Sequence, residues 1–346
     1  MNFTSDNTSG VAPRIMQAMM AANDGHVPSY GADPLSAAVQ AQLRILLDAP
    51  QAQVFLVSTG TAANALSCAA LTDSEGMIFT HRHAHIVEDE KDAPLFYTRN
   101  AELVLLDGAD NKFTAAALKT AITYTKHVCQ LDALRGMVSL TNVTEAGALY
   151  SPDEVAAIAD VAHQAGLYVH MDGARFANAV SALNCTPGQL ISGVDVLSFG
   201  GTKNGCLAVE AIVFLTPELA EGFADLMKRG GHVTSKMRYL AAQMMAYLDS
   251  GLWLRLAGQA NRMAKRLSDG ILAAGGSVAH PVQANEVFAT LPRSAHDKLH
   301  AAGARYYYWP DDPSRTGPAD EQILARLVCS WATTSAEVDR FLAQLS

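Results

Sequence analysis

The stretch Ser198–Leu207, SFGGTKNGCL, carries a single lysine, Lys203, among small residues. It directly follows Val194–Leu197, a short apolar segment typical of a buried strand. About thirty residues upstream, a second strand-like segment, Leu167–Met171, ends in the sequence DGAR at Asp172–Arg175. We therefore expect two strands of one sheet that present an aspartate and a lysine beyond their carboxyl ends, where ligands bind in open α/β sheets.

An enzyme that uses pyridoxal phosphate requires this pairing of an aspartate and a lysine. The lysine amine condenses with the aldehyde of the cofactor as a Schiff base, and small neighbours let the ring and the phosphate approach. The carboxylate pairs with the pyridinium nitrogen, so that the ring can accept electrons. Lys203 and Asp172 fit these roles, and Thr202 offers a hydroxyl to the phosphate.

Each of these residues also has a purely structural interpretation. Lys203 could be a surface lysine on a flexible turn, since such lysines are far commoner than catalytic ones. Asp172 could cap a helix that begins at Ala174, with Arg175 as a solvated residue of its first turn. Taken alone, the aspartate slightly favours the cap, and the lysine downstream reverses that balance.

A second candidate binding element is Ser58–Asn64, STGTAAN, which follows the predicted strand Val54–Val57 and begins a helix. Free backbone N–H groups at a helix N-terminus attract a phosphate, with Gly60 permitting close approach and Thr61 adding a hydroxyl. The same residues also fit an ordinary N-capped helix, because serine and threonine are preferred caps. The motif alone does not separate the two interpretations.

Three histidines, His81, His83 and His85, follow the predicted strand Met77–Thr80 at a spacing of two residues. As metal ligands they would need an extended segment and a fourth partner, and no nearby cysteine or carboxylate pattern supplies one. We therefore predict no metal site. The preferred interpretation is one imidazole that stacks on an aromatic cofactor or exchanges protons near neutral pH, with the other two structural or exposed.

The composition is that of a folded globular protein. Of the 346 residues, 49% are apolar and 17% are charged, and the net charge of −9 without a basic patch argues against nucleic acid as a partner. No apolar run approaches the roughly 20 residues of a membrane span, and the first residues do not resemble a signal peptide. The cysteines are scattered without CxxC spacing, which predicts buried thiols in a reducing cytoplasm. They are Cys68, Cys129, Cys185, Cys206 and Cys329.

From Val54 onward, short apolar runs alternate with helix-like segments, which predicts an α/β fold with a mainly parallel sheet covered on both faces. The expected strands are Val54–Val57, Met77–Thr80, Leu103–Leu106, Met137–Leu140, Leu167–Met171, Val194–Phe199 and Ala208–Leu215. The expected helices are Pro13–Ala22, Leu35–Leu47, Ala62–Leu71, Thr114–Ala121, Pro152–Gln164, Ala174–Leu183, Pro217–Lys228, Thr234–Leu248 and Trp253–Ala274. Three later strand candidates predict a small C-terminal α+β domain: Val287–Leu291, Arg305–Trp309 and Arg326–Trp331. We place the boundary near Ser250-Gly251, so that residues 1–250 form the N-terminal arm and large domain and residues 251–346 the small domain.

Together these motifs resemble the threonine aldolase branch of the pyridoxal phosphate-dependent β-eliminating lyases, over nearly the whole chain. The segments that carry the resemblance are Ser5–Thr8 with Pro13, Tyr30–Pro34, Ser58–Asn64, Ala84-His85, His170–Arg175, Gly201–Gly205 and Ala325–Val328. The aspartate–arginine signature and the lysine turn at this separation are its most specific part. The resemblance implies an aminotransferase-like large domain with a mainly parallel seven-stranded sheet.

The resemblance also implies roles for individual residues. His85 would stack on the cofactor ring, and Arg175 would lie beside the ring oxygen or the substrate. Ser5 and Arg175 would join Arg326 around the amino acid carboxylate.

Other residues would come from a neighbouring subunit. Lys236 or Arg238 would reach the phosphate, and Tyr30 would cross a dimer interface to the substrate. The resemblance therefore implies a homo-oligomer, a dimer of dimers, whose active sites are shared between subunits.

One departure concerns the loop after the fourth predicted strand. Many members of the family carry a histidine there, whereas this chain places Glu145. If that histidine deprotonates the substrate hydroxyl in other members, Glu145, His85 or a water must do so here. The preference between the threonine and allo-threonine configurations is left open.

The expected activity is retro-aldol cleavage of L-threonine, L-allo-threonine and related β-hydroxy-α-amino acids, including L-phenylserine, to glycine and an aldehyde. One alternative keeps the cofactor and changes the reaction to β-elimination, transamination or racemisation. Another is a non-enzymatic sheet protein in which Asp172 and Lys203 form only an ion pair or a cap.

Overall fold

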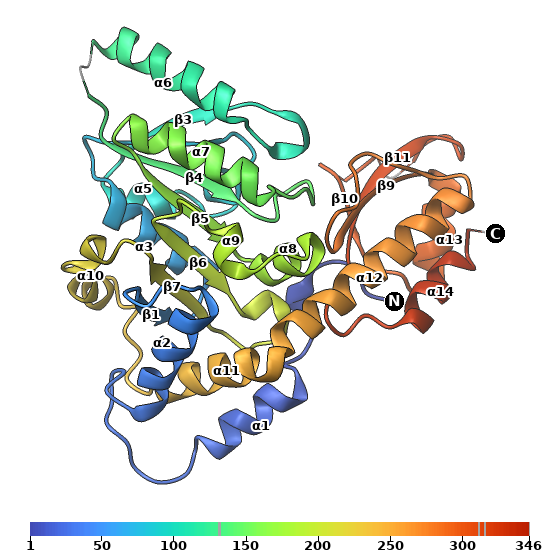
Figure 1. Cartoon of the computed structure of the whole chain (residues 1–346). Helices are drawn as coiled ribbons and strands as arrows, with labels where there is room; N and C mark the ends of the chain where they lie inside the picture. Colours follow the sequence, from blue (N-terminus) through green and yellow to red (C-terminus); the bar gives the residue numbers. More distant parts are fainter. Residues whose placement is uncertain (131–132, 311, 315, 346) are drawn as a thin grey trace.

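The computed structural model describes residues 1–130, 133–310, 312–314 and 316–345 (Figure 1). Its larger part is built on a seven-stranded sheet with the strand order β1-β7-β6-β5-β4-β2-β3. The strands are β1 (Gln53–Val57), β2 (Met77–His81), β3 (Glu102–Leu106), β4 (Gly136–Thr141), β5 (Tyr168–Gly173), β6 (Val196–Gly200) and β7 (Glu210–Phe214). All seven strand predictions are confirmed to within two residues at either end.

The sheet is mainly parallel, as predicted. Strands β3, β2, β4, β5 and β6 are paired in parallel, and only β7 runs antiparallel, against both β6 and β1. Every residue of β2, β4, β6 and β7 is buried, because helices cover both faces and leave no side of these strands in water. The parallel arrangement brings the carboxyl ends of β2, β5 and β6 to one edge of the sheet.

Two apolar cores fill the space between the sheet and its helices. The larger core includes residues of α6 (Ala115–Cys129), α7 (Pro152–Gln164) and α8 (Phe176–Leu183), with α1 (Pro13–Ala21), α2 (Pro34–Leu46) and α11 (Arg238–Leu248). The second core, on the opposite face, includes residues of α3 (Gly60–Leu71), α4 (His85–Glu88) and α10 (Phe223–Arg229). The short helices α5 (Ala93–Thr98) and α9 (Pro187–Leu190) complete the larger part of the molecule.

The C-terminal part contains a second, smaller sheet that lies beside the large one (Figure 1). Its antiparallel sheet has the order β10-β11-β9-β8, and three helices accompany it. The strands are β8 (Ser277–Val278), β9 (Glu286–Pro292), β10 (Tyr307–Tyr308) and β11 (Gln322–Val328), and the helices are α12 (Leu252–Ala273), α13 (Arg293–Ala301) and α14 (Ser335–Leu342). The N-terminal arm joins this core through Phe3, whose N–H and carbonyl bond to Arg305 and Val328 at 2.7 and 2.8 Å.

Several element boundaries differ from the predictions for local reasons. The strand predicted at Arg326–Trp331 begins earlier and ends at Val328, because Ser330 turns the chain through a hydrogen bond to Thr333. The helix predicted over Pro217–Lys228 is divided at Gly222, where φ is +72°. The boundary at Ser250-Gly251 stays a prediction, and it falls between α11 and α12.

None of the helices in the described part of the chain combines the length and apolarity that a membrane crossing demands.

Candidate active site

A cavity of about 540 Å³ lies at the carboxyl edge of the large sheet. Segments that follow four strands line it: Ser58–Thr61 after β1, His85 after β2, Asp172 and Ala174 at the end of β5, and Thr202-Lys203 after β6. The N-terminal arm adds Asn7 and Ser9–Val11. The cavity is therefore assembled where parallel strands of an α/β sheet direct their ligand-binding loops.

Asp172 is held as an ionised carboxylate at the floor of this cavity. Its Oδ1 accepts a hydrogen bond from the N–H of Ala174 at 2.9 Å, and its Oδ2 accepts one from Nδ2 of Asn64 at 2.9 Å. Burial would raise the pKa of Asp172, but the charges of His85 and Lys203, together with the hydrogen bond from Ala174, hold that pKa below its usual value. A buried anion of this kind suits a protonated heterocyclic nitrogen.

Lys203 belongs to a packed turn rather than to a flexible surface loop. Its neighbour Asn204 is buried and donates hydrogen bonds to the Tyr247 hydroxyl at 2.7 Å and to the Trp253 carbonyl at 2.8 Å. Gly200 is required at the entrance of this turn, because an added Cβ would lie 2.4 Å from the carbonyl oxygen of Ala174. The turn therefore fixes the lysine backbone while its side chain lines the cavity.

Glu210 supports the same turn from the first residue of β7. Its Oε2 accepts a hydrogen bond from the N–H of Gly201 at 2.8 Å. Burial raises the pKa of Glu210 to about 7, although hydrogen bonds from Thr202 and Gly201 oppose the shift. The sequence analysis did not select this residue, which lies seven positions beyond Lys203 inside an apolar strand.

The segment Ser58–Thr61 is consistent with both interpretations of its sequence, a capped helix and a binding site for a phosphate. Thr59 caps α3, with its hydroxyl accepting from the N–H of Ala62 at 3.1 Å. Open space surrounds the position that a Cβ on Gly60 would occupy, so the helix N-terminus faces the cavity unobstructed. An anion can therefore approach the N–H groups of this turn.

His85 lines the cavity next to two polar residues that the sequence analysis missed. Its Nδ1 lies 2.9 Å from Oε1 of Glu90, and Asn64 donates to that same oxygen at 2.8 Å. Burial would lower the pKa of His85, but the hydrogen bond to Glu90 and the charges of Glu145 and Asp172 together outweigh burial, so that pKa is raised. In the sequence, only its position five residues after His85 distinguishes Glu90. His81 and His83 line a separate small cavity.

His85, Glu90 and Asp172 also place their ligand atoms within 4.8 Å of one another, a spacing that a metal ion could use. Asn64, however, directs its amide N–H groups at both carboxylates. Donor hydrogens between the acids describe a hydrogen-bond network, and they would repel a cation placed there.

The two arginines predicted to bind a carboxylate meet in a buried cluster of charges. Arg175 forms a bidentate pair with Asp6, at 2.8 Å from Nε and 3.2 Å from Nη2. Arg326 donates to Glu286, whose Oε1 also lies 3.5 Å from Nη2 of Arg175. Neither Arg175 nor Arg326 lines the 540 Å³ cavity. Ser5, which is predicted to bind the same substrate carboxylate, accepts a hydrogen bond from the N–H of Asn7 at 3.2 Å.

The remaining predicted residues are distributed over three places. Glu145 follows β4 and lies close enough to Lys203 and His85 for their charges to oppose the rise that burial causes in its pKa. Tyr30 is exposed, and Lys228 lies 4.7 Å from its ring centroid. Lys236 is exposed, and Arg238 donates to carbonyls of the loop after α1. Within this one chain, none of Tyr30, Lys236 and Arg238 lines the cavity.

The residues that line the cavity fit pyridoxal phosphate, although they offer its phosphate few basic side chains. Asp172 matches the ring nitrogen, Lys203 the aldehyde, and the N-terminus of α3 with Thr61 and Thr202 the phosphate. Among the described lining residues Lys203 is the only lysine or arginine, against the acids Asp172, Glu90 and Glu210. A doubly charged phosphate therefore meets no lysine or arginine besides Lys203 among the described residues that line the cavity.

Comparisons with known proteins agree with this geometry. The family model described as β-eliminating lyase matches residues 2–294. The chain is 40% identical to the low specificity L-threonine aldolase of Pseudomonas aeruginosa over 334 residues, which cover 96% of this chain and 93% of the relative. It is 37% identical to an enzyme of the same name from a Pseudomonas species, over 99% of this chain and 96% of the relative. The solved structure of threonine aldolase from Leishmania major superposes with a TM-score of 0.90 at 26% identity, covering 99% and 98% of the two chains.

Proposed function

The chain belongs to the β-eliminating lyase family, and on this basis we propose that it is a pyridoxal phosphate-dependent aldolase. It cleaves L-threonine, L-allo-threonine and related β-hydroxy-α-amino acids to glycine and an aldehyde. The observation that carries the proposal is identity of 37–40%, over nearly the full length, to two enzymes named low specificity L-threonine aldolase. The placement of Lys203 and Asp172 in one cavity supports it.

When bound, pyridoxal phosphate draws electrons from the carbon that carries the amino group, so that a bond at this carbon can break. In the proposal, the ionised Asp172 keeps the ring nitrogen protonated, and Lys203 supplies the amine that holds the aldehyde. Gly60, Thr61 and Thr202 receive the phosphate at the N-terminus of α3.

His85 is the proposed site of proton exchange with the substrate hydroxyl. Because Glu90 engages its Nδ1, Nε2 is the ring atom left to exchange a proton. Glu145 is the second candidate for this role, because it lies near both His85 and Lys203.

Arg326 is the proposed partner of the substrate carboxylate, with Ser5 beside it. The side chain of Arg326 is 15% exposed, whereas that of Arg175 is 5% exposed and already forms two hydrogen bonds with Asp6. A side chain with unused donors and an accessible face can receive a carboxylate at lower cost. Arg175 then acts by fixing the N-terminal arm against the end of β5.

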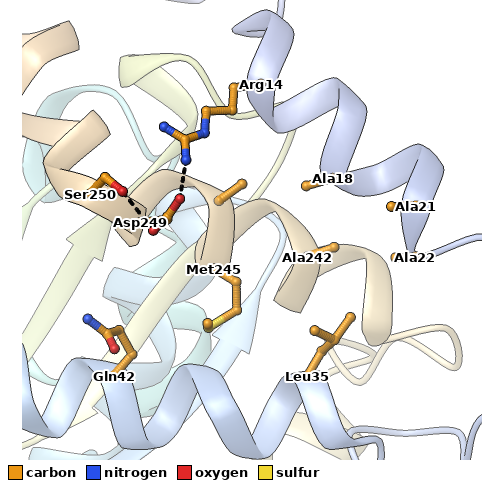
Figure 2. Close-up of a pocket in the computed structure, with 11 residues that line it drawn as sticks. Arg14, Ala18, Ala21, Ala22, Leu35, Gln42, Ala242, Met245, Asp249 and Ser250 are labelled. Carbon is orange, nitrogen blue, oxygen red and sulfur yellow. Dashed lines mark hydrogen bonds and ion pairs between the residues drawn. The ribbon is translucent and has the colours of Figure 1, made fainter.

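We propose further that the enzyme is a homo-oligomer, a dimer of dimers, in which Lys236 or Arg238 of one subunit reaches the phosphate of another. The shortage of basic side chains around the cavity supports this arrangement, and Tyr30 would cross the same interface. An apolar groove of about 550 Å³ between α1, α2 and α11, with Ala18, Leu35 and Met245 on its walls, offers surface for such association (Figure 2). The free cysteines agree with a cytoplasmic location.

Product analysis tests this function directly. The purified protein, reconstituted with pyridoxal phosphate, should release glycine and an aldehyde from L-threonine, L-allo-threonine and L-phenylserine. Lys203→Ala should fold normally yet lose the visible absorbance of bound cofactor and the activity, while the exposed control Lys265→Ala should keep both. Pyruvate and ammonia as the products would instead identify a β-elimination, and activity retained in Lys203→Ala would overturn the mechanism.

A further inference from the structure

Arg326, which the proposed function assigns to the substrate carboxylate, is already paired with a glutamate of the chain itself. Glu286, the first residue of β9, has a completely buried side chain, and its Oε1 accepts a hydrogen bond from Nη2 of Arg326. Its other oxygen, Oε2, is buried without a hydrogen-bond partner among the residues that the structure describes. Burying a carboxylate with one oxygen unsatisfied is costly, and the contacts of Oε1 with Arg326 and Arg175 offset part of that cost.

Buried carboxylates already pair with both arginines before any substrate enters. Asp6 pairs with Arg175 through two hydrogen bonds, and Asn285 adds a third to Asp6 at 3.1 Å. Asp6 is thus the main partner of Arg175 and Glu286 that of Arg326, and Oε1 of Glu286 also lies 3.5 Å from Nη2 of Arg175. Glu145 and Lys203 lie near enough to act on the same cluster, so the carboxylate of an amino acid would enter a site where acids and cations already face one another.

The backbone and the Cβ of Glu286 have little freedom to move away from this cluster. Its backbone is fixed in β9 by pairing with Val328 of β11. On the other side, Gly147 packs so closely that a Cβ there would lie 3.3 Å from the Cβ of Glu286. An incoming carboxylate thus meets a negative charge that stays near Arg326, and like charges repel strongly where water is excluded.

We propose that Glu286 is the internal counter-ion of Arg326 and that an amino acid binds by competing with it, which keeps the affinity for the carboxylate group low. This inference rests on the proposed function, in which Arg326 receives the substrate carboxylate. Glu286 would then set the Michaelis constant and the release of glycine, without contact with the bond that breaks. A merely structural role, in which Glu286 holds Arg326 in place, predicts the opposite effect on affinity.

Glu286→Gln separates the two roles, because glutamine keeps an acceptor for Arg326 and removes the charge. In the holoenzyme, calorimetric titration should show glycine binding about five- to tenfold more tightly, because the charge that competes for Arg326 has been removed. Binding of 2-aminoethanol, which lacks the carboxylate, should not change. The Michaelis constant for L-threonine should fall by a similar factor, with a smaller change in kcat.

Two further variants keep the test decisive. Glu286→Asp withdraws the charge from Arg326 by one methylene and should tighten glycine binding in the same direction by a smaller factor, even where the glutamine variant folds poorly. Glu321→Gln, which removes a partly exposed partner of Arg293 in the same part of the molecule, should leave glycine binding unchanged. Unchanged or weaker glycine binding in both Glu286 variants would overturn the inference while wild-type cleavage of L-threonine left the proposed function intact. A wild-type holoenzyme that neither binds glycine nor releases an aldehyde would overturn the proposed function itself.

Discussion

Glu90 and His85 form a hydrogen-bonded pair in which the carboxylate is completely buried and the imidazole remains 27% exposed, with 2.9 Å between Oε1 and Nδ1. The buried acid fixes the ring, and the exposed side of the ring faces the cavity. Asn64 links the pair to Asp172, since its Nδ2 donates to both carboxylates. The groups proposed to act on the substrate and on the cofactor therefore share one network.

Replacing the carboxylate of Glu90 by an uncharged amide should shift the pH dependence of catalysis. Because the hydrogen bond to Glu90 raises the pKa of His85 against the effect of burial, Glu90→Gln should lower that pKa. The limb of the profile of kcat/KM that follows His85 should move to lower pH, and kcat should fall by about one to two orders of magnitude as the ring loses its orientation. NMR titration of the imidazole would check the shift independently.

The chain contains a matched control for this experiment. His83 and Glu88 form a similar pair at 2.6 Å, but their side chains are 49% and 39% exposed and neither lines the cavity. Glu88→Gln should therefore leave the profile unchanged. An equal shift in both variants would mean that Glu90 acts only through general electrostatics.

Glu210 should make the apoprotein less stable as the pH rises. Burial raises the pKa of this acid from 4.5 to about 7, so the folded state holds a proton that the unfolded state has already lost between these values. The stability linked to Glu210 is thus greatest below pH 4.5 and falls as the pH rises to about 7. Glu210→Gln should remove this loss, which amounts to at most about 3 kcal/mol.

Urea unfolding at pH 5 and pH 8 measures this effect as a difference in the free energy of unfolding. The exposed Glu218 serves as the control, because Glu218→Gln should keep the wild-type pH dependence. If the free energy of unfolding changed equally between pH 5 and pH 8 in wild type and Glu210→Gln, the acid would ionise normally in the folded protein.

The pair of Asp6 and Arg175 should contribute to stability at neutral pH. Arg175 and Lys203 hold the pKa of Asp6 below its usual value although burial opposes them, so this contribution is present above the unfolded pKa near 3.8 and is lost as pH falls further. Asp6→Asn leaves the buried guanidinium poorly paired and should lower the free energy of unfolding at pH 7 by about 3 kcal/mol. The exposed pair of Arg266 and Asp339 offers a comparison, since Asp339→Asn should cost less than about 1 kcal/mol.

Sharing of active sites can be tested by mixing inactive subunits. Lys203→Ala removes the anchor of one site, and Lys236→Ala combined with Arg238→Ala removes the cation offered to the neighbouring site. If sites are shared across a dimer, reassociation of equal amounts should restore about a quarter of the sites, because half of the dimers are hybrids with one intact site each. No recovery, with hybrid dimers demonstrated by mass, would mean that the cation comes from elsewhere.

Local sequence was a sound guide to the elements that carry the site. Asp172, Lys203 and Gly60 were identified because each follows a short apolar strand and stands beside small or helix-capping residues. Such patterns reflect interactions within a few residues, which the chain order records directly. The strands of the large sheet were predictable for the same reason, whereas β11 was misplaced because its end depends on a turn between Ser330 and Thr333.

By itself, the sequence determined that an aspartate, a lysine and a helix N-terminus stand at the carboxyl edge of one mainly parallel sheet. Only the tertiary structure decided which charges surround them. Asp6 reaches Arg175 across 169 residues, and Glu286 reaches Arg326 across 40. The first contact depends on how the N-terminal arm packs against the end of β5, and the second on the pairing of β9 with β11 in the small sheet. A buried charge takes whichever partner the tertiary structure brings within hydrogen-bond distance.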